Sequence, residues 1–262
     1  MSLRVTHLWA FFGRLSESFI AEEILALRRS GVAADVVSLR EEAGGPASLS
    51  TETLRPWVRR LEPSASRWVN ALLLLPRVAA VPWVCWQGHA VFPRKGLGRA
   101  VERLRSAALT AGLGRALASC PPQVVHAQHG HVGWWALPVA RRLRLPMVVS
   151  LRGRDISLLE RLAGPRLCRM FDAPVRYLAR CRSMADLLLS KGFPAGRVFV
   201  HASGVAVRGI AFRERSAPAA GGPAVLLSVG RLVQKKGMSD AISAFAACRA
   251  ARRALLRIVG DG

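Results

Sequence analysis

Short runs of apolar residues alternate along the chain with longer segments in which apolar residues recur every three or four positions. The runs are continuous and are bounded by glycine, proline or charged residues, which is typical of parallel strands covered on both faces. In the N-terminal part the predicted strands are residues 3–10, 32–39, 124–125, 147–151 and 197–201. The segments between the strands have the spacing of amphipathic helices. Strands that alternate with helices predict an α/β fold with a parallel sheet.

The first strand and the helix after it form a unit suited to an anionic ligand. Gly13 follows the strand and permits a tight turn or the close approach of a ligand to the backbone. Ser16 is the expected N-cap of the next helix, which ends at Gly31. The apolar face of this helix consists of Phe19, Ile20, Ile24, Leu25 and Leu27. A helix N-terminus beside a glycine turn is a common anion site, although many such turns bind nothing.

Further helices are expected at residues 94–119, 134–143 and 177–189. Residues 41–66 are polar and contain glycine, proline and serine, which indicates a link. Residues 68–92 are rich in leucine, valine and tryptophan, but Pro76, Arg77 and Pro82 argue against a membrane-spanning helix. Two interpretations of 68–92 stay open: a helical insertion packed on its own domain, or a tryptophan- and arginine-rich patch at a membrane surface.

The C-terminal part repeats the α/β pattern on a smaller scale. Residues 212–223 contain prolines, glycines and alanines and are the best linker candidate, which divides the chain into domains at 1–211 and 224–262. In the second domain we expect a buried strand at 224–229, a helix at 239–250 and a strand at 255–259. One such unit is smaller than most domains that form an independent core.

Two cations stand directly after the strand at 224–229. Arg231 follows a glycine at the C-terminal end of this strand, where ligands bind in open α/β sheets, and Lys236 lies five residues further on. A guanidinium grips phosphate oxygens with two parallel bonds, and a lysine adds a mobile positive charge. The pattern favours a phosphorylated ligand, although charged loop residues also commonly do no more than face the solvent.

The segment GRLVQKKGMSDAISAF, which contains these two cations, resembles the G-R-L-x-x-x-K-G segment of retaining glycosyltransferases of family 4. The resemblance implies a GT-B fold of two Rossmann-like domains, in which Arg231 and Lys236 hold the diphosphate of a nucleotide-sugar donor. LSESFIAEEI is similar to the opening of bacterial exopolysaccharide and lipopolysaccharide glycosyltransferases of that family, the type that includes the colanic-acid enzymes. Gly13, Ser16 and Glu17 would then line the cleft between the domains, with Gly13 near the diphosphate.

A second candidate site is the segment QVVHAQHGHVG at residues 123–133. It resembles the H-A-H-F-G segment of the family, whose second histidine faces the sugar and the acceptor. His126 matches the first histidine, Gln128 stands in place of the second, and His129 occupies a position that is commonly aromatic. The three are the expected catalytic residues. The histidines at 126, 129 and 131 could also suggest a metal site, but no carboxylate or cysteine accompanies them in the sequence, so we expect no metal.

A third segment, PMVVSLRGRDIS, resembles the T-x-H-G-x-D pattern of the family. Gly153 and Asp155 match the pattern, whereas Arg152 stands in place of its histidine. Both Gln128 and Arg152 therefore replace an imidazole of the presumed cleft, and Arg152 adds a permanent positive charge. Arg152 and Asp155 are expected on the acceptor side of the cleft.

The amino-acid composition limits the classes of binding partner that we expect. The 262 residues are 51% apolar, so the chain can build a core, and their net charge of +23 favours anionic partners. No basic run is interleaved with aromatic residues and no zinc-finger pattern occurs, so nucleic acid is not an expected partner. Five scattered cysteines without a C-x-x-C pair favour a reducing compartment, and the N-terminus has too short an apolar run for a signal peptide. We expect a cytoplasmic protein, with peripheral binding to an anionic membrane as a possibility.

The resemblance implies a hexosyltransferase-type enzyme that moves a sugar from a nucleotide-sugar to a lipid-linked or polysaccharide acceptor with retention of configuration. No metal cofactor is expected, because Arg231 and Lys236 supply the positive charge that the leaving diphosphate needs. The E-x7-E motif of the family would lie beyond Gly262, so we expect this chain to be truncated in its donor domain and inactive alone. The alternative is a non-catalytic module that binds an acceptor or a membrane.

Overall fold

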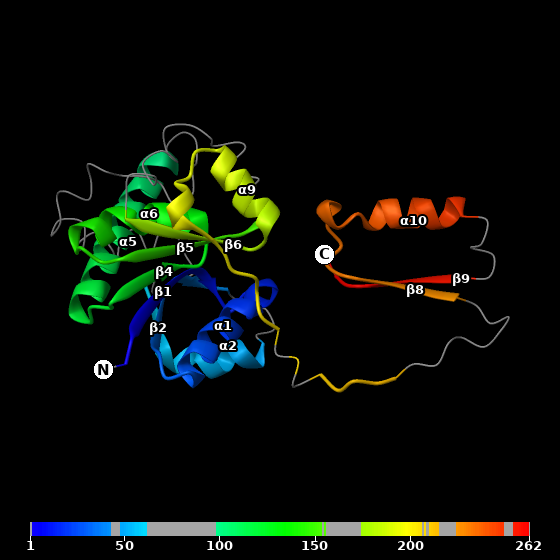
Figure 1. Ribbon diagram of the computed structural model, residues 1–262, viewed down its shortest axis with the longest axis horizontal. Coiled ribbons are helices and arrows are strands. Elements are labelled where there is room, and N and C mark those ends of the chain that lie inside the picture. The colour runs from blue at the N-terminus through cyan, green and yellow to red at the C-terminus, as the bar shows by residue number, and fades with distance from the viewer. Residues whose placement is uncertain are drawn as a thin grey trace. The chain divides into compact units, whose positions relative to one another are not determined.

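A computed structural model divides the chain into two compact units, Met1–Ala206 and Val207–Gly262 (Figure 1). The structure describes residues 2–42, 48–61, 98–153, 155, 174–205, 207, 210–214, 224–248 and 254–261. Each unit combines parallel strands with helices, so the predicted α/β fold is confirmed.

A seven-stranded sheet of order β3-β2-β1-β4-β5-β6-β7 forms the centre of the first unit. All its described strand pairs are parallel. Its strands are β1 (Arg4–Phe12), β2 (Ala33–Glu41), β3 (Val58–Arg60), β4 (Val124–Ala127), β5 (Met147–Leu151), β6 (Val175–Ala179) and β7 (Val198–Val200). The strand order reverses between β1 and β4, because the chain runs outward to β3 and then returns to the other side of β1. Ligands of open parallel sheets bind outside the C-terminal ends of the strands at such a reversal.

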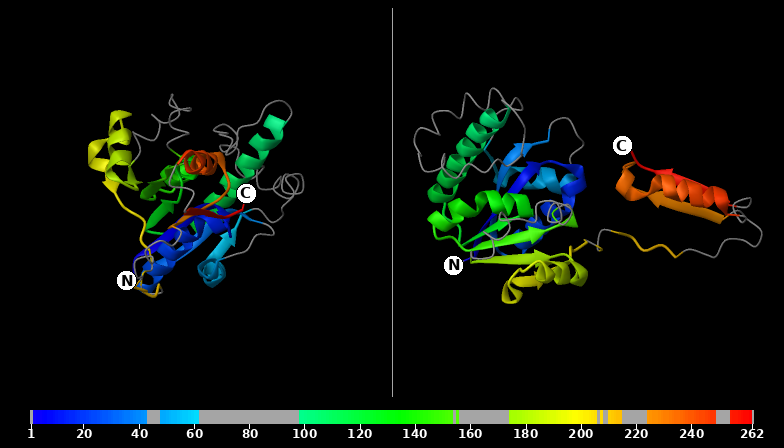
Figure 2. Two further views of the ribbon diagram at one scale, coloured as in Figure 1. Left: turned by 90° about the vertical axis from the view of Figure 1, so that its right-hand side faces the viewer. Right: turned by 90° about the horizontal axis from the view of Figure 1, so that it is seen from above.

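Helices cover the two faces of this sheet (Figures 1 and 2). They are α1 (Ser18–Arg29), α2 (Leu49–Leu54), α5 (Gly98–Ser119), α6 (Gly130–Arg142) and α9 (Arg182–Ser190). The larger core cluster contains residues of α5, α6 and α9, and the smaller one contains residues of α1 and α2. Successive residues of β1 serve both clusters, since Leu8 belongs to the larger and Trp9 to the smaller. Gly133 allows α6 to lie close to β5, because a Cβ there would be 2.6 Å from Val149 Cγ2.

Two predictions of secondary structure in the first unit are wrong. The helix expected at 177–189 begins only at Arg182, and the residues before it form β6. In β6 the alternate residues Val175, Tyr177 and Ala179 are buried, which is the period of a strand. The link expected at 41–66 contains α2, which is capped by the Ser48 hydroxyl, and the edge strand β3.

The expected N-cap of the first helix is also wrong. A short 3-10 helix, Leu15–Glu17, precedes α1, and Glu17 occupies the N-cap position without a capping hydrogen bond from its side chain. Ser16 is exposed within the 3-10 turn. The end of the helix is as predicted, since Gly31 follows it with a φ of +86°.

Residues 68–92, for which two interpretations were open, lie outside the described residues. Within the described part of the chain, no helix combines the length and the apolar character needed to cross a membrane.

The second unit consists of parallel strands β8 (Ala224–Val229) and β9 (Ala254–Val259) with α10 (Met238–Ala247). All three elements were predicted. The expected burial of the strand at 224–229 is wrong, because Val225, Leu227 and Val229 are exposed. A parallel strand becomes buried on both faces only when helices cover both faces and strands flank it. The described residues of this unit supply one helix and one neighbouring strand.

Candidate functional site

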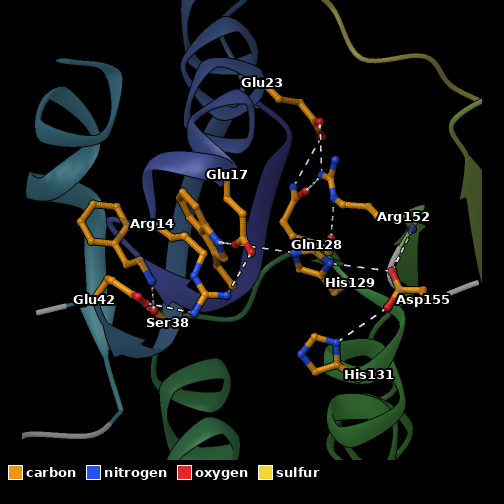
Figure 3. Close-up of polar contacts among 12 residues, drawn as sticks. Arg14, Glu17, Glu23, Ser38, Glu42, Gln128, His129, His131, Arg152 and Asp155 are labelled. Carbon is orange, nitrogen blue, oxygen red and sulfur yellow. Dashed lines mark hydrogen bonds and ion pairs between the residues drawn. The ribbon is translucent and has the colours of Figure 1, made fainter. Parts of the chain in front are cut away.

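The candidate site of the first unit is built from residues that follow three neighbouring strands. Glu17 comes after β1, His129 after β4 and Asp155 after β5, and these strands lie side by side at the point where the strand order reverses. Figure 3 shows His129 between Glu17 and Asp155, with His131 near His129 and facing the same Asp155 carboxylate. The fold therefore brings together three of the residues that the sequence assigned to the cleft.

His129 lies between two carboxylates. Its Nε2 is 3.6 Å from Glu17 Oε2, and its Nδ1 is 3.8 Å from Asp155 Oδ2. Trp9 Nε1 donates a 2.6 Å hydrogen bond to Glu17 Oε2 and so holds the first carboxylate in place. Burial lowers the pKa of His129, but Asp155 and Glu17 raise it, and the net shift is upward. Burial would raise the pKa of Glu17, yet the contacts with His129 and Trp9 keep it below its ordinary value.

Asp155 is buried beside the N-terminus of α6. Its Oδ2 accepts a 2.8 Å hydrogen bond from the backbone N–H of Arg152, and its Oδ1 lies 3.8 Å from His131 Nδ1. Burial would raise the pKa of Asp155, but His129 and His131 together with this backbone N–H bring it well below its ordinary value. Gly130 permits the approach, because a Cβ there would lie 3.2 Å from the carboxyl carbon of Asp155.

Gln128 and Arg152, which the sequence led us to expect in place of two histidines, contact each other. Arg152 Nε donates a 2.8 Å hydrogen bond to the backbone oxygen of Gln128, and Arg152 Nη2 donates to Gln128 Oε1. The guanidinium lies 4.5 Å from the centre of the Phe19 ring, and Nη2 is 3.8 Å from Glu23 Oε2. Burial, with a further effect from the charge of Arg180, lowers the pKa of Arg152 to about 10, so it stays positively charged at neutral pH.

Gln128 and His126 lie deeper, in the core of the sheet. Gln128 Oε1 accepts from Arg152, so its Nε2 donates to His7 Nδ1 at 3.0 Å. His126 Nε2 lies 2.8 Å from Ser150 Oγ, and its ring centre is 4.9 Å from that of His7. Burial lowers the pKa of His126 to about 4, and it lowers the pKa of His7 well below its ordinary value. Both rings are therefore neutral at pH 7.

The remaining predicted cleft residues lie on the turn after β1. Gly13 has a φ of +90°, a left-handed conformation that favours glycine. Next to it, Arg14 forms ion pairs with Glu17 at 3.5 Å and with Glu42 at 3.1 Å. Ser16 is exposed, and its side chain does not cap α1.

Arg231 and Lys236 lie in the second unit, on the loop that joins β8 to α10. Both side chains are exposed. The loop is held at its base, because Gly230 N donates to Val259 O at 3.0 Å and Leu232 N donates to Asp261 O at 2.9 Å. Gly260 has to be a glycine, since a Cβ there would be 1.9 Å from the backbone oxygen of Gly230. The structure thus places the two cations on one loop of the second unit, whose base is held by backbone hydrogen bonds.

The sequence did not single out three residues of the first-unit site. Trp9 and Glu23 belong to the buried faces of β1 and α1, and Arg180 follows β6, which was predicted as helix. Arg180 lies 3.9 Å from Glu23 and shares this carboxylate with Arg152. Glu23 was detectable as an acidic residue next to Ile24 on the otherwise apolar side of the first helix.

Within the described part of the chain, one group of side chains offers the ligand atoms of a metal site: His129, His131 and Asp155, whose ligand atoms all lie within 4.8 Å of one another. The sequence argument against a metal was that no carboxylate accompanies the histidines. That premise is wrong, because the fold places Asp155 beside them although it lies far from them in the sequence.

The sequence model of Glycosyltransferase Family 4 matches residues 16–208, which is more than half of the 262 residues. The chain belongs to this family. The match covers the first-unit residues of the candidate site except His7 and Trp9 of β1 and the turn residues before Ser16. A comparison with curated proteins found no match.

Solved structures show where the fold of this family 4 chain recurs. The lipopolysaccharide outer core galactosyltransferase WaaB in its apo form superposes with a TM-score of 0.58 at 14% identity, covering 99% of this chain and 61% of WaaB. A glycosyltransferase from Rickettsia africae gives 0.53 at 10% identity, with coverage of 100% and 69%. A putative UDP-N-acetylglucosamine 2-epimerase from Listeria monocytogenes gives 0.51 at 14% identity, with coverage of 98% and 62%.

The fold is therefore the GT-B type, and this chain spans less than two thirds of the length of WaaB. Because the fold is shared by a transferase and an epimerase, the fold alone does not select the reaction. The reaction therefore has to be inferred from the family and from the residues of the candidate site.

Proposed function

We propose that this chain belongs to an enzyme that transfers a sugar from a nucleotide-sugar to a lipid-linked or polysaccharide acceptor with retention of configuration. The observation that carries the proposal is the loop after β8, in which a member of family 4 presents Arg231 and Lys236 beside a braced glycine turn. These cations would neutralise the diphosphate of the donor as the sugar leaves, so that this step needs no metal.

The first unit would hold the acceptor and the sugar. His129 is the predicted catalytic residue that lies at the strand ends between carboxylates, and we assign it to contact with the sugar or the acceptor. His126 and Gln128, the other two predicted catalytic residues, would act from the core, where His126 contacts Ser150 and Gln128 holds Arg152. Arg152 Nη1 is buried without a hydrogen-bond partner among the described residues, which suits an acceptor that carries a phosphate.

Titration of the full chain with nucleoside diphosphates, followed by saturation-transfer NMR or calorimetry, tests the proposal. Exposed charge-assisted bonds without a closed cleft support affinities near about 1 mM. Arg231→Ala should weaken binding about 10- to 100-fold, since it removes bonds of about 1.5–3 kcal/mol. Lys236→Ala should weaken it less, because a lysine offers no bidentate grip.

Two matched variants serve as controls. Arg257→Ala removes an exposed arginine from β9 of the same unit, and Lys235→Ala removes the lysine next to Lys236. Neither should change the affinity. The proposal fails if no nucleoside diphosphate binds saturably, or if the control variants weaken binding as much as Arg231→Ala and Lys236→Ala do.

A second candidate role is a module that binds an anionic membrane surface at the cytoplasmic face. The net charge of +23 favours it, because each basic residue near an anionic surface contributes about 1 kcal/mol. The same property would bring a sugar-transferring enzyme to a lipid-linked acceptor, so the two roles are compatible.

A further inference from the structure

Two imidazoles and a carboxylate meet at the C-terminal ends of β4 and β5. His129 is the residue before α6, His131 lies in the first turn of this helix, and Asp155 follows β5. His129 Nδ1 is 3.8 Å from Asp155 Oδ2, and His131 Nδ1 is 3.8 Å from Asp155 Oδ1. These separations are too long for hydrogen bonds.

The separations are close to those of ligand atoms around one metal ion. Two bonds of about 2.1 Å at a tetrahedral angle place their ligand atoms about 3.4 Å apart. The two imidazole–carboxylate separations would need to shorten by about 0.4 Å around an ion, and the three ligand atoms all lie within 4.8 Å of one another. Figure 3 shows that both histidine rings face the Asp155 carboxylate.

Two of the candidate ligand atoms are buried and form no hydrogen bond within the described part of the chain. Asp155 Oδ1 and His129 Nδ1 have no hydrogen-bond partner among the described residues, and their side chains are 4% and 9% exposed. A buried polar atom without a partner costs about 1–3 kcal/mol. A bound cation would satisfy both atoms at once.

The surroundings hold these ligands in the orientation that a metal requires. The other nitrogen of His129, Nε2, faces Glu17 Oε2 at 3.6 Å, and Trp9 fixes this carboxylate. Metal-binding histidines commonly donate their second N–H to a carboxylate, which leaves the first nitrogen to bind the ion; Glu17 stands on the side of His129 where such an acceptor is needed, although 3.6 Å is longer than a hydrogen bond. On the other side, the backbone N–H of Arg152 holds Asp155 Oδ2 and leaves Oδ1 available.

The residue between the two histidines completes the arrangement. A Cβ at Gly130 would lie 3.2 Å from Asp155 Oδ1 and 2.8 Å from Leu151 Cδ2. Any larger residue would push the carboxylate away from the histidines. The His-Gly-His sequence at 129–131 is therefore able to receive a carboxylate from the neighbouring strand.

We propose that His129, His131 and Asp155 bind a divalent first-row transition metal ion such as zinc. Two imidazoles and one carboxylate suit zinc and its neighbours, whereas magnesium and calcium prefer oxygen ligands alone. Three protein ligands leave a coordination position open for water or for an oxygen of a bound molecule. The His131 side chain is 23% exposed, so the site is open on that side. The metal is distinct from the charges assigned to the donor diphosphate, and the proposal does not depend on sugar transfer.

Metal binding by the untagged full chain, stripped of metal with a chelator, tests the proposal. Cobalt(II) is the spectroscopic probe, and zinc is titrated in competition with a chromophoric chelator. We expect one equivalent of cobalt with visible absorption bands of a low-coordinate site, which one equivalent of zinc abolishes. Asp155→Asn and His131→Gln should each weaken binding at least about tenfold, since changes outside the ligand set already cost about 10–100-fold.

His201→Ala removes an exposed histidine of the same unit and should leave the affinity and the spectrum unchanged. Circular dichroism in the presence of the chelator shows whether each variant folds. Should Asp155→Asn fail to fold, His131→Gln decides, because His131 is partly exposed and its loss leaves the buried contacts of Asp155 with Arg152 in place. The proposal is overturned if the wild-type chain takes up no metal, or if the ligand variants bind it as tightly as the wild type.

Discussion

The buried guanidinium of Arg152 should be a main support of the first unit, and Arg152→Ala tests this directly. The substitution removes two hydrogen bonds to Gln128, the ion pair with Glu23 and the contact with the Phe19 ring. It leaves Gln128 Oε1 buried without its donor. It does not leave Glu23 isolated, because Arg180 remains 3.9 Å from that carboxylate.

These contacts determine how far Arg152→Ala should lower the free energy of unfolding. Removing one partner of a buried charged network costs about 3–5 kcal/mol when the other charge is left unpaired. Since Arg180 still pairs with Glu23, we expect a value near the lower limit, about 3 kcal/mol, for the loss in free energy of unfolding. Arg180→Ala is the matched control. Its guanidinium is more exposed, and besides the ion pair with Glu23 it has a longer contact of 5.5 Å with the centre of the Phe19 ring, so its loss should cost less than about 1 kcal/mol.

Urea denaturation followed by tryptophan fluorescence measures this difference. All seven tryptophans lie before residue 207, so the signal reports the first unit and is not affected by the second. Combining Arg152→Ala with Gln128→Ala in a double-mutant cycle should give a coupling of about 1–3 kcal/mol, because the two side chains are in contact. Equal destabilisation by Arg152→Ala and Arg180→Ala, or a coupling near zero, would refute the reasoning.

Three further predictions follow from the fold and the charge. Burial lowers the pKa of His126 from 6.5 to about 4, so the first unit should lose stability as the pH falls from 6.5 toward 4. The loss in free energy of unfolding should be about 2 kcal/mol at pH 5. The variant His126→Gln should remove this part of the pH dependence in denaturation followed by fluorescence. Gly133→Ala should cost about 1–3 kcal/mol by forcing α6 away from Val149, whereas Gly196→Ala, with open space around it, should be nearly neutral in the same assay. Liposomes with anionic lipid should sediment more of the protein than neutral liposomes, and equal sedimentation would contradict peripheral binding.

The sequence predicts the strands of this protein well, because the buried strands of a parallel sheet are short continuous apolar runs. Seven of the nine described strands match predicted apolar runs, for example β1, β2 and β8. Of the two missed strands, β3 lies in the segment interpreted as a link, and β6 was missed because its apolar residues continue at helical spacing into α9. The alternation of buried Val175, Tyr177 and Ala179 with Arg176 was the signal that distinguishes it.

The candidate site was only partly predictable. Glu17, His129, Arg152 and Asp155 were identified individually, from motifs that follow separate strands. Their mutual contacts depend on β1, β4 and β5 being neighbours, and this order is a property of the whole sheet. The sequence therefore separated the histidines at 129 and 131 from Asp155, and the argument against a metal site rested on that separation.

The same property of the fold changes the meaning of the two departures from the family pattern. In the sequence, Gln128 and Arg152 are two unrelated losses of an imidazole. In the structure they form one unit, because the backbone and side-chain oxygens of Gln128 accept two of the five N–H groups of Arg152. A histidine at 128 would offer no side-chain oxygen to this guanidinium, and a histidine at 152 would leave Gln128 Oε1 without its donor. The structure therefore joins the two expected departures into one feature, a positive charge anchored at the strand ends.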